Sequence, residues 1–247
     1  MALKALLLDF NGVILDDERI HEQLIQELLV AENLRPQPGD FRNYCLGCSD
    51  RAGLTNLLAS RGRVVSQAYL EDMIKRKSQA YLHKLDTLDQ LPLFQGVQTL
   101  IQEATAANLK IAIVSGALRL EIETVLTRSG LAKYIHGIVA AEDVTASKPD
   151  PEGYQTAIQR LREQVSTLSD LSPQDCLALE DTFPGIEAAK AAHVPVVGVA
   201  HTYPFHMLQR CTNWTVDYLS ELELPRIQAV FAGQPYPTAI AEEKVAQ

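Results

Sequence analysis

A carboxylate directly follows a strongly apolar stretch near the start of the chain. Residues 5–8, Ala-Leu-Leu-Leu, are followed by Asp9, and the pair Asn11-Gly12 then opens a turn. An apolar run that ends at a glycine turn is typical of a buried parallel strand. Open α/β folds place their chemistry at the carboxyl ends of such strands. Asp9 is therefore the first candidate for a catalytic side chain.

Further polar residues follow strand-like runs later in the chain. Ser115 comes after the second run and Glu180-Asp181 after the fourth, while Lys148 lies in a loop that can reach them. Because parallel strands end at one edge of a sheet, we expect these side chains to converge on Asp9. A nucleophilic carboxylate, a hydroxyl, an ammonium group and acidic metal ligands suit phosphoryl transfer, in which catalysis is mostly positioning and charge neutralisation.

Each of these residues also has an ordinary structural interpretation. Asp9 could cap a turn, and Ser115 could cap a helix. Lys148, Glu180 and Asp181 could be exposed loop residues. Their placement after strand-like runs, in a single order along the chain, favours one shared site.

That order resembles the haloacid dehalogenase superfamily, and the resemblance covers nearly the whole chain. In the family an aspartate motif comes first, a serine or threonine follows the second strand, a lysine precedes the fourth and an acidic pair follows it. Residues 9–13, Asp-Phe-Asn-Gly-Val, resemble the first motif, Asp-x-Asp-Gly-Thr/Val. Residues 179–182, Leu-Glu-Asp-Thr, resemble the acidic motif of its capped sugar-phosphate phosphatases and β-phosphoglucomutases.

The resemblance implies a bound metal ion and an aspartyl-phosphate. It implies Mg2+ held by the Asp9 carboxylate, the Asn11 main-chain carbonyl and Asp181, with Glu180 assisting. Asp9 would be the nucleophile that carries the phosphoryl group. Because Asn11 would bind through its main chain, the asparagine at this position is compatible with the metal site.

The resemblance also assigns residues to the substrate. Ser115 and Lys148 would hold the phosphoryl group, and Gly116 would lie against the substrate. Arg51 ends a segment, Leu-Gly-Cys-Ser-Asp-Arg, that resembles a substrate-binding segment of the cap, so Arg51 is a candidate phosphate clamp. His21 matches a cap-hinge histidine of β-phosphoglucomutases. An exposed arginine and a solvated histidine are the ordinary alternatives for the last two.

Asn11 departs from the family pattern, because the family has an aspartate there that acts as general acid and base. An amide does not exchange a proton near pH 7, and loss of acid–base help costs about 10²–10⁴-fold in rate. The favoured interpretation is a Mg2+-dependent phosphatase-like hydrolase that works through an aspartyl-phosphate on Asp9, and three interpretations of its activity remain open. The protein could be a slow phosphatase, or a phosphatase in which another residue such as His21 serves as the acid–base group. It could retain the aspartyl-phosphate as a long-lived state. It could also be a catalytically impaired module that binds a phosphate ligand or a protein. β-Phosphoglucomutase activity is disfavoured, since it depends on the second aspartate in both half-reactions.

The elements that must position these residues follow from hydrophobic periodicity. Between residues 17 and 90 only helical spacing occurs, and strand-like and helical segments alternate afterwards. Strands are expected at 4–9, 110–114, 137–140, 175–179, 194–199 and 214–216, and helices at 17–32, 51–60, 66–84, 97–107, 118–129, 152–163 and 186–192.

This alternation predicts an α/β fold with a doubly wound, parallel, Rossmann-like sheet. A small all-helical cap domain is inserted after the first strand. We expect the core to comprise residues 1–16 and 92–232 and the cap residues 17–91. Residues 233–247 are expected to form a loose tail.

Bulk composition excludes several other classes of protein. The chain has 247 residues, of which 47% are hydrophobic and 21% charged, and its net charge of −9 argues against nucleic acids or anionic membranes as general partners. No apolar run approaches the ~20 residues of a membrane span, so we expect a cytoplasmic protein. The family resemblance implies a small phosphorylated substrate. A protein partner is open. Cys45 and Cys48 lack a second pair at zinc-site spacing and are interpreted as ordinary thiols.

Overall fold

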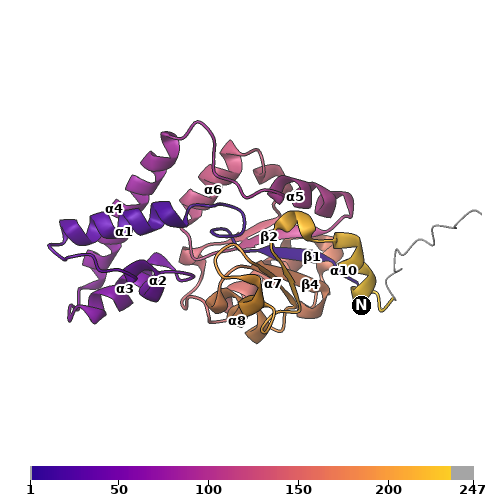
Figure 1. Cartoon of the computed structure of the whole chain (residues 1–247). Coiled ribbons are helices and arrows are strands. Elements are labelled where there is room, and N and C mark those ends of the chain that lie inside the picture. The colour runs from indigo at the N-terminus through magenta and orange to yellow at the C-terminus, as the bar shows by residue number, and fades with distance from the viewer. Residues whose placement is uncertain (1, 235–247) are drawn as a thin grey trace, which may run out of the picture.

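The central element is a parallel β-sheet with the strand order β3-β2-β1-β4-β5-β6. The computed structural model describes residues 2–234 (Figure 1). The direction of the strand order reverses at β1 and β4, which is where open α/β sheets form a crevice for ligands. The expected fold class is confirmed. The strands are β1 (Ala5–Leu8), β2 (Lys110–Val114), β3 (Gly137–Val139), β4 (Cys176–Glu180), β5 (Val196–Val199) and β6 (Trp214–Val216).

Helices cover both faces of the sheet because alternate residues of each strand point to opposite faces. Leu6 and Leu8 of β1 join one apolar cluster, with residues of helices α5, α6 and α10. Ala5 and Leu7 join the cluster on the other face, with residues of α7 and α8 (Figure 1). The core helices are α5 (Val97–Ala106), α6 (Arg119–Arg128), α7 (Glu152–Gln164), α8 (Phe183–Ala191), α9 (Phe205–Leu208) and α10 (Leu224–Phe231).

Four of the five helices between β1 and β2 stand to one side of the sheet (Figure 1). They are α1 (Glu18–Ala31), α2 (Asp40–Tyr44), α3 (Asp50–Ser60) and α4 (Gln67–Asp86). Residues of α1, α3 and α4 form an apolar cluster of their own, which includes Ile25, Leu57 and Met73. Leu24 and Tyr81 instead join the core cluster. We call these four helices the cap. The proposed division at residues 16/17 and 91/92 stays a prediction.

Several elements differ from the sequence expectation. Helix α8 begins at Phe183, three residues before the predicted start, because Thr182 caps it by accepting a hydrogen bond from the Gly185 amide. Pro184 suits the first turn of a helix, where its missing N–H is not needed. Helices α2, α9 and α10 were not predicted, since short helices carry little periodic signal. The predicted loose tail falls almost entirely on residues 235–247, which lie outside the described part of the chain.

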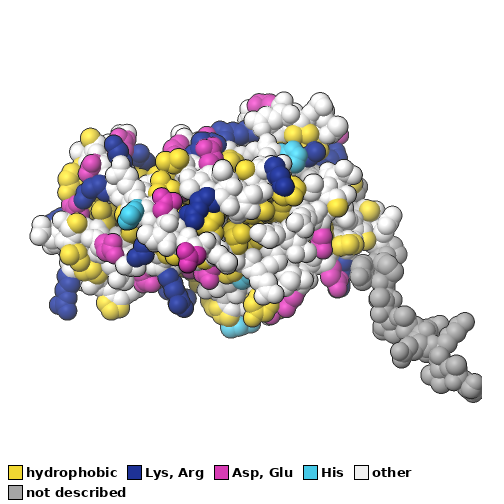
Figure 2. All heavy atoms as spheres, turned by 90° about the horizontal axis from the view of Figure 1, so that it is seen from above, with side chains coloured by type: hydrophobic (Ala, Val, Ile, Leu, Met, Phe, Trp, Pro, Cys, Tyr) yellow, Lys and Arg dark blue, Asp and Glu magenta, His cyan; other side chains and the backbone are white. Residues whose placement is uncertain are grey.

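The surface carries both signs of charge. Acidic and basic side chains are scattered over the face seen in Figure 2, and no broad basic surface covers it. Along residues 2–234, no helix is both long and apolar enough to span a membrane.

Candidate active site

Asp9, Lys148 and Glu180 form a buried chain of charges at the carboxyl ends of β1 and β4. In the parallel pairing of β1 with β4, Leu8 lies opposite Leu179. The residues that follow them, Asp9 and Glu180, therefore lie side by side at the ends of the two strands. Lys148 Nζ lies 2.9 Å from Asp9 Oδ1 and 2.7 Å from Glu180 Oε1. Burial alone would lower the pKa of Lys148, but the two carboxylates outweigh it and raise the pKa above its ordinary value. The lysine is therefore a fixed positive charge beside Asp9.

Three carboxylates gather at the same edge, and one lysine does not neutralise them. Oxygens of Asp9, Glu180 and Asp181 lie within 4.8 Å of one another, and all three residues are buried. Asp181 Oδ1 and Glu180 Oε2 are buried and have no hydrogen-bond partner among the described residues. Burial and the charge of Asp9 raise the pKa values of Glu180 and Asp181 well above their ordinary range. Unpaired carboxylate oxygens in this arrangement fit a hard divalent cation such as Mg2+.

Gly12 allows Asp181 to approach the turn after β1. Its φ of 78° lies in the left-handed region, and a Cβ there would lie 1.9 Å from Asp181 Oδ2. The same oxygen accepts a hydrogen bond of 2.5 Å from Thr202. The glycine turn that marked the first motif thus brings the ends of β1 and β4 together.

Ser115 and Gly116 follow β2 and meet the cap. Ser115 is buried, and its Oγ accepts a hydrogen bond of 3.0 Å from the amide of Ala117. A Cβ on Gly116 would lie 3.0 Å from the backbone nitrogen of Ser49, so the cap backbone passes close to the core here. The Ser49 amide also donates to Ser147 Oγ at 2.9 Å, which ties the start of α3 to the loop that carries Lys148.

A cavity lies between the strand ends and the cap. Its volume of about 70 Å3 is well below the ~300–1,000 Å3 of ligand pockets, so cap and core lie close together over the site. The cysteines 45 and 48 line it as free thiols, and burial raises the pKa of Cys45 to about 12. The side chains that give it polar character are Asp9, Asn11, Glu18, His21, Asp50, Lys77, Ser115, Glu121, Lys148 and Thr182.

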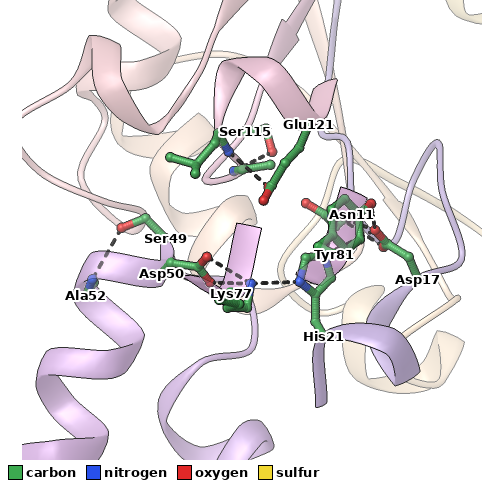
Figure 3. A network of polar contacts seen from close by, with 12 residues as sticks. Asn11, Asp17, His21, Ser49, Asp50, Ala52, Lys77, Tyr81, Ser115 and Glu121 are labelled. Carbon is green, nitrogen blue, oxygen red and sulfur yellow. Dashed lines mark hydrogen bonds and ion pairs between the residues drawn. The ribbon is translucent and has the colours of Figure 1, made fainter. Parts of the chain in front are cut away.

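The Asn11 side chain contacts a buried carboxylate, whereas the family motif has a carboxylate at this position. Its Nδ2 lies 3.0 and 2.8 Å from the two carboxylate oxygens of Asp17 (Figure 3). Asp17 Oδ2 also accepts a hydrogen bond of 2.5 Å from Tyr81 and lies 3.1 Å from His21 Nε2. Burial would raise the pKa of Asp17, but His21 and the hydrogen-bond donors outweigh it and lower the pKa. Asp17 is therefore a stable buried anion next to Asn11.

His21 joins this carboxylate to the cap. Lys77 Nζ lies 2.9 Å from His21 Nδ1 and 2.7 Å from Asp50 Oδ1. Burial would lower the pKa of Lys77, but Asp50 and Glu121 raise it above its ordinary value, so Lys77 is charged and donates. His21 Nδ1 must then accept, and the ring proton sits on Nε2, where it points to Asp17. Figure 3 shows these residues in one continuous network.

The structure brings together most of the residues predicted from the sequence. Asp9, Asn11, His21, Ser115, Gly116 and Lys148 line the cavity, and Glu180 and Asp181 lie in the acidic cluster beside it.

Arg51 is the exception, because the neighbouring residue Asp50 lines the cavity in its place. The Arg51 side chain is 52% exposed and pairs with Glu71 at 3.3 Å, outside the cavity. Asp50 faces inward instead. A signal for this was present, because Asp50 shares a helical face with the apolar residues Leu54 and Leu57, four and seven positions later.

The sequence analysis also missed Asp17, Lys77 and Glu121. The i,i+4 spacing of Asp17 and His21 could have indicated their contact. Lys77 and Glu121 reach the site from distant helices, and no local spacing marks them.

The comparisons with known proteins agree with this geometry. A family model described as haloacid dehalogenase-like hydrolase matches residues 6–199. Protein CbbY from Rhodobacter capsulatus is 30% identical over 89% of this chain and 95% of its own length. A phosphorylated carbohydrates phosphatase from Thermotoga maritima is 27% identical over 81% of this chain and 87% of its own length. The crystal structure of β-phosphoglucomutase from Clostridium difficile has a TM-score of 0.81 at 22% identity and covers 94% of this chain and 98% of its own.

Proposed function

The chain belongs to the haloacid dehalogenase-like hydrolase family, as the order of its motifs predicted, and on that premise we propose that it is a Mg2+-dependent phosphatase of a small phosphorylated metabolite. One observation carries the proposal. The Asp9 carboxylate lies 2.9 Å from a buried lysine, at an edge where two further carboxylates have unpaired oxygens. The phosphatase from Thermotoga maritima supports a phosphorylated sugar as the substrate. A cytoplasmic location, favoured by the sequence, belongs to the same proposal.

Asp9 is the nucleophile in this proposal. Its Oδ1 accepts a hydrogen bond of 2.7 Å from the Phe10 amide and lies 2.9 Å from Lys148 Nζ, so Oδ2 is the oxygen left for attack. Oδ2 forms a bond to phosphorus while the ester P–O bond breaks, and the alkoxide leaves. Water then attacks phosphorus, the bond between phosphorus and Asp9 breaks, inorganic phosphate is released and the Asp9 carboxylate is regenerated. The proton that the water loses balances the one that the alkoxide takes up.

Charge compensation makes attack by an anion on a phosphate feasible. Lys148 supplies one buried positive charge. Mg2+, held by Asp9 and Asp181 with the Asn11 carbonyl and Glu180, would supply the rest. Ser115 and the amide of Gly116 donate hydrogen bonds to the phosphoryl oxygens.

Proton transfer is the weak step, because Asn11 carries no titratable proton. His21 is the titratable cavity residue next to it, with Nε2 3.2 Å from Asn11 Nδ2. Both ring nitrogens are already engaged, Nδ1 by Lys77 at 2.9 Å and Nε2 by Asp17 at 3.1 Å. We therefore assign proton transfer to His21 and expect slow turnover for alkoxide leaving groups, because these contacts hold the ring away from its task.

The test is hydrolysis of p-nitrophenyl phosphate and a panel of sugar phosphates, with and without Mg2+. We expect phosphate release that requires Mg2+ and is abolished in Asp9→Asn, which lacks the nucleophile. A protein that binds Mg2+ and vanadate but releases no phosphate from any substrate would contradict the proposal. It would favour the alternative of a catalytically impaired module that binds a phosphate ligand or a protein.

A further inference from the structure

The cap side of the cavity carries carboxylates and a single lysine. Asp50 from α3, Lys77 from α4 and Glu121 from α6 line it together (Figure 3). We call these three residues the cap-side group. Among the described residues that line the cavity, Lys77 and Lys148 are the only lysines or arginines, and Lys148 is already held between Asp9 and Glu180.

The positive charge of Lys77 is also already paired with a neighbouring carboxylate. Its Nζ lies 2.7 and 2.8 Å from the two oxygens of Asp50, and Lys77 is 3% exposed. The third contact of Nζ is His21 Nδ1, at 2.9 Å. An ammonium group makes three hydrogen bonds, so a ligand would have to displace one of these partners. Lys77 thus fixes Asp50 and His21 and is not a free cation.

Glu121 has an unused acceptor. The residue is 1% exposed, and its Oε2 accepts a hydrogen bond of 3.3 Å from the Leu118 amide. Its Oε1 is buried and has no hydrogen-bond partner of ordinary geometry within residues 2–234. Burial raises the pKa of this carboxyl group, while Lys77 and Ser78 favour its charged form. Figure 3 shows the carboxylate extending from α6 towards Asp50 and Lys77. A buried acceptor without a partner is costly, so the arrangement favours a ligand that brings a hydrogen-bond donor.

Within the part of the chain that the structure describes, no second phosphate clamp lies near this group. Arginine is the usual bidentate ligand of phosphate, and Arg51 points out of the cavity to Glu71. A second phosphate at the cap side would meet the carboxylates of Asp50 and Glu121 in a buried setting. Repulsive elements of this kind exclude wrong ligands as effectively as attractive contacts select the right one.

We propose that the cap-side group selects a monophosphate whose organic part carries hydroxyl or ammonium donors, and that it rejects bisphosphates. Glu121 Oε1 and Asp50 accept hydrogen bonds from those donors, while the single phosphate binds at Asp9 and Lys148. This inference rests on the proposed function, because it needs the phosphate at the strand ends.

The experiment measures binding by calorimetry in the Asp9→Asn variant with Mg2+, so that hydrolysis does not interfere. The probes are glucose 6-phosphate, glucosamine 6-phosphate, glucose 1,6-bisphosphate and p-nitrophenyl phosphate. We expect the two sugar monophosphates to bind at least about tenfold more tightly than the bisphosphate. Tighter binding of the amino sugar would identify an ammonium donor, and equal binding a hydroxyl donor.

Two variants test whether the cap-side group is the source of the ligand preference. Glu121→Gln and Asp50→Asn, each in the same background, should weaken the sugar monophosphates about tenfold and reduce the discrimination against the bisphosphate. The matched control is Glu123→Gln, since Glu123 lies on the same helix with a half-exposed side chain outside the cavity. It should leave every affinity unchanged. Circular dichroism checks that each variant is folded.

Binding of the bisphosphate as tightly as the monophosphates would overturn the inference. A preference that survives both Glu121→Gln and Asp50→Asn would also overturn it, because the cap-side group would not be its source. Wild-type hydrolysis of p-nitrophenyl phosphate is measured separately. Its absence would count against the proposed phosphatase, while the ligand preference would still be decided by the binding data.

Discussion

Asn11 donates its side-chain amide to both carboxylate oxygens of Asp17, at 3.0 and 2.8 Å. The asparagine that departs from the family motif is thus matched to a buried anion six residues later. Asp17 lies behind Asn11 and does not line the cavity. An amide satisfies this carboxylate, whereas a second carboxylate would repel it. The contact with Asp17 therefore explains why an asparagine is favoured at position 11, which the motif alone does not reveal.

The first prediction concerns stability. Asn11→Asp places two carboxylates in contact in a buried setting and should lower the free energy of unfolding by about 2–4 kcal/mol at pH 7.5. The loss should shrink at pH 5, because a proton shared by the pair removes the repulsion. Urea unfolding at the two pH values measures it. The double variant Asn11→Asp/Asp17→Asn should recover most of the loss, and failure to recover would show that Asp17 is not the cause.

The second prediction concerns turnover. In Asn11→Asp/Asp17→Asn an acid–base group returns to position 11 with an amide to orient it. Phosphatase activity on alkyl phosphates should rise by about tenfold or more, since their leaving groups need a proton in the transition state. p-Nitrophenyl phosphate, with a better leaving group, should gain less. No gain on any substrate, while Mg2+ and vanadate still bind, would show that more than the proton donor is missing.

The third prediction concerns the metal. Asp181→Ala removes a carboxylate from the acidic cluster and should weaken Mg2+ binding by more than tenfold. Calorimetry on the two proteins measures the change. Asp170→Ala is the control, because the Asp170 side chain is 77% exposed and pairs with Lys4 away from the site. Equal affinities in wild type and Asp181→Ala would remove Asp181 from the metal site.

The fourth prediction concerns pH. Burial and Asp9 raise the pKa values of Glu180 and Asp181 in the folded protein above the 4.5 and 3.8 of ordinary side chains. The folded state then binds more protons than the unfolded state above about pH 4, so these two groups make stability fall as pH rises. In EDTA, wild type should lose stability between pH 5 and 8 more steeply than Asp181→Asn. Mg2+ should flatten the wild-type profile by pairing with the carboxylates. Identical slopes in EDTA would contradict this origin.

The sequence determined the sheet, the order of the motifs and the convergence of the strand ends. Apolar runs such as residues 5–8 become buried strands wherever both faces are covered, and parallel strands end at one edge. Asp9, Ser115, Glu180 and their neighbours could therefore be placed without coordinates. The chain carried this information locally, because strand type and strand end are read from residues next to one another.

Tertiary structure alone decided which cap residues face the site. Lys77 meets His21 across 56 residues because α4 packs against α1. The contact of Asn11 with Asp17 depends on how the turn after β1 folds back. Asp50 rather than Arg51 enters the cavity because adjacent helical residues differ by about 100° in direction, and burial of the apolar face of α3 sets that angle. Motif spacing describes the order of residues along the chain, whereas the packing of helices fixes the rotation that turns a side chain into a cavity or away from it.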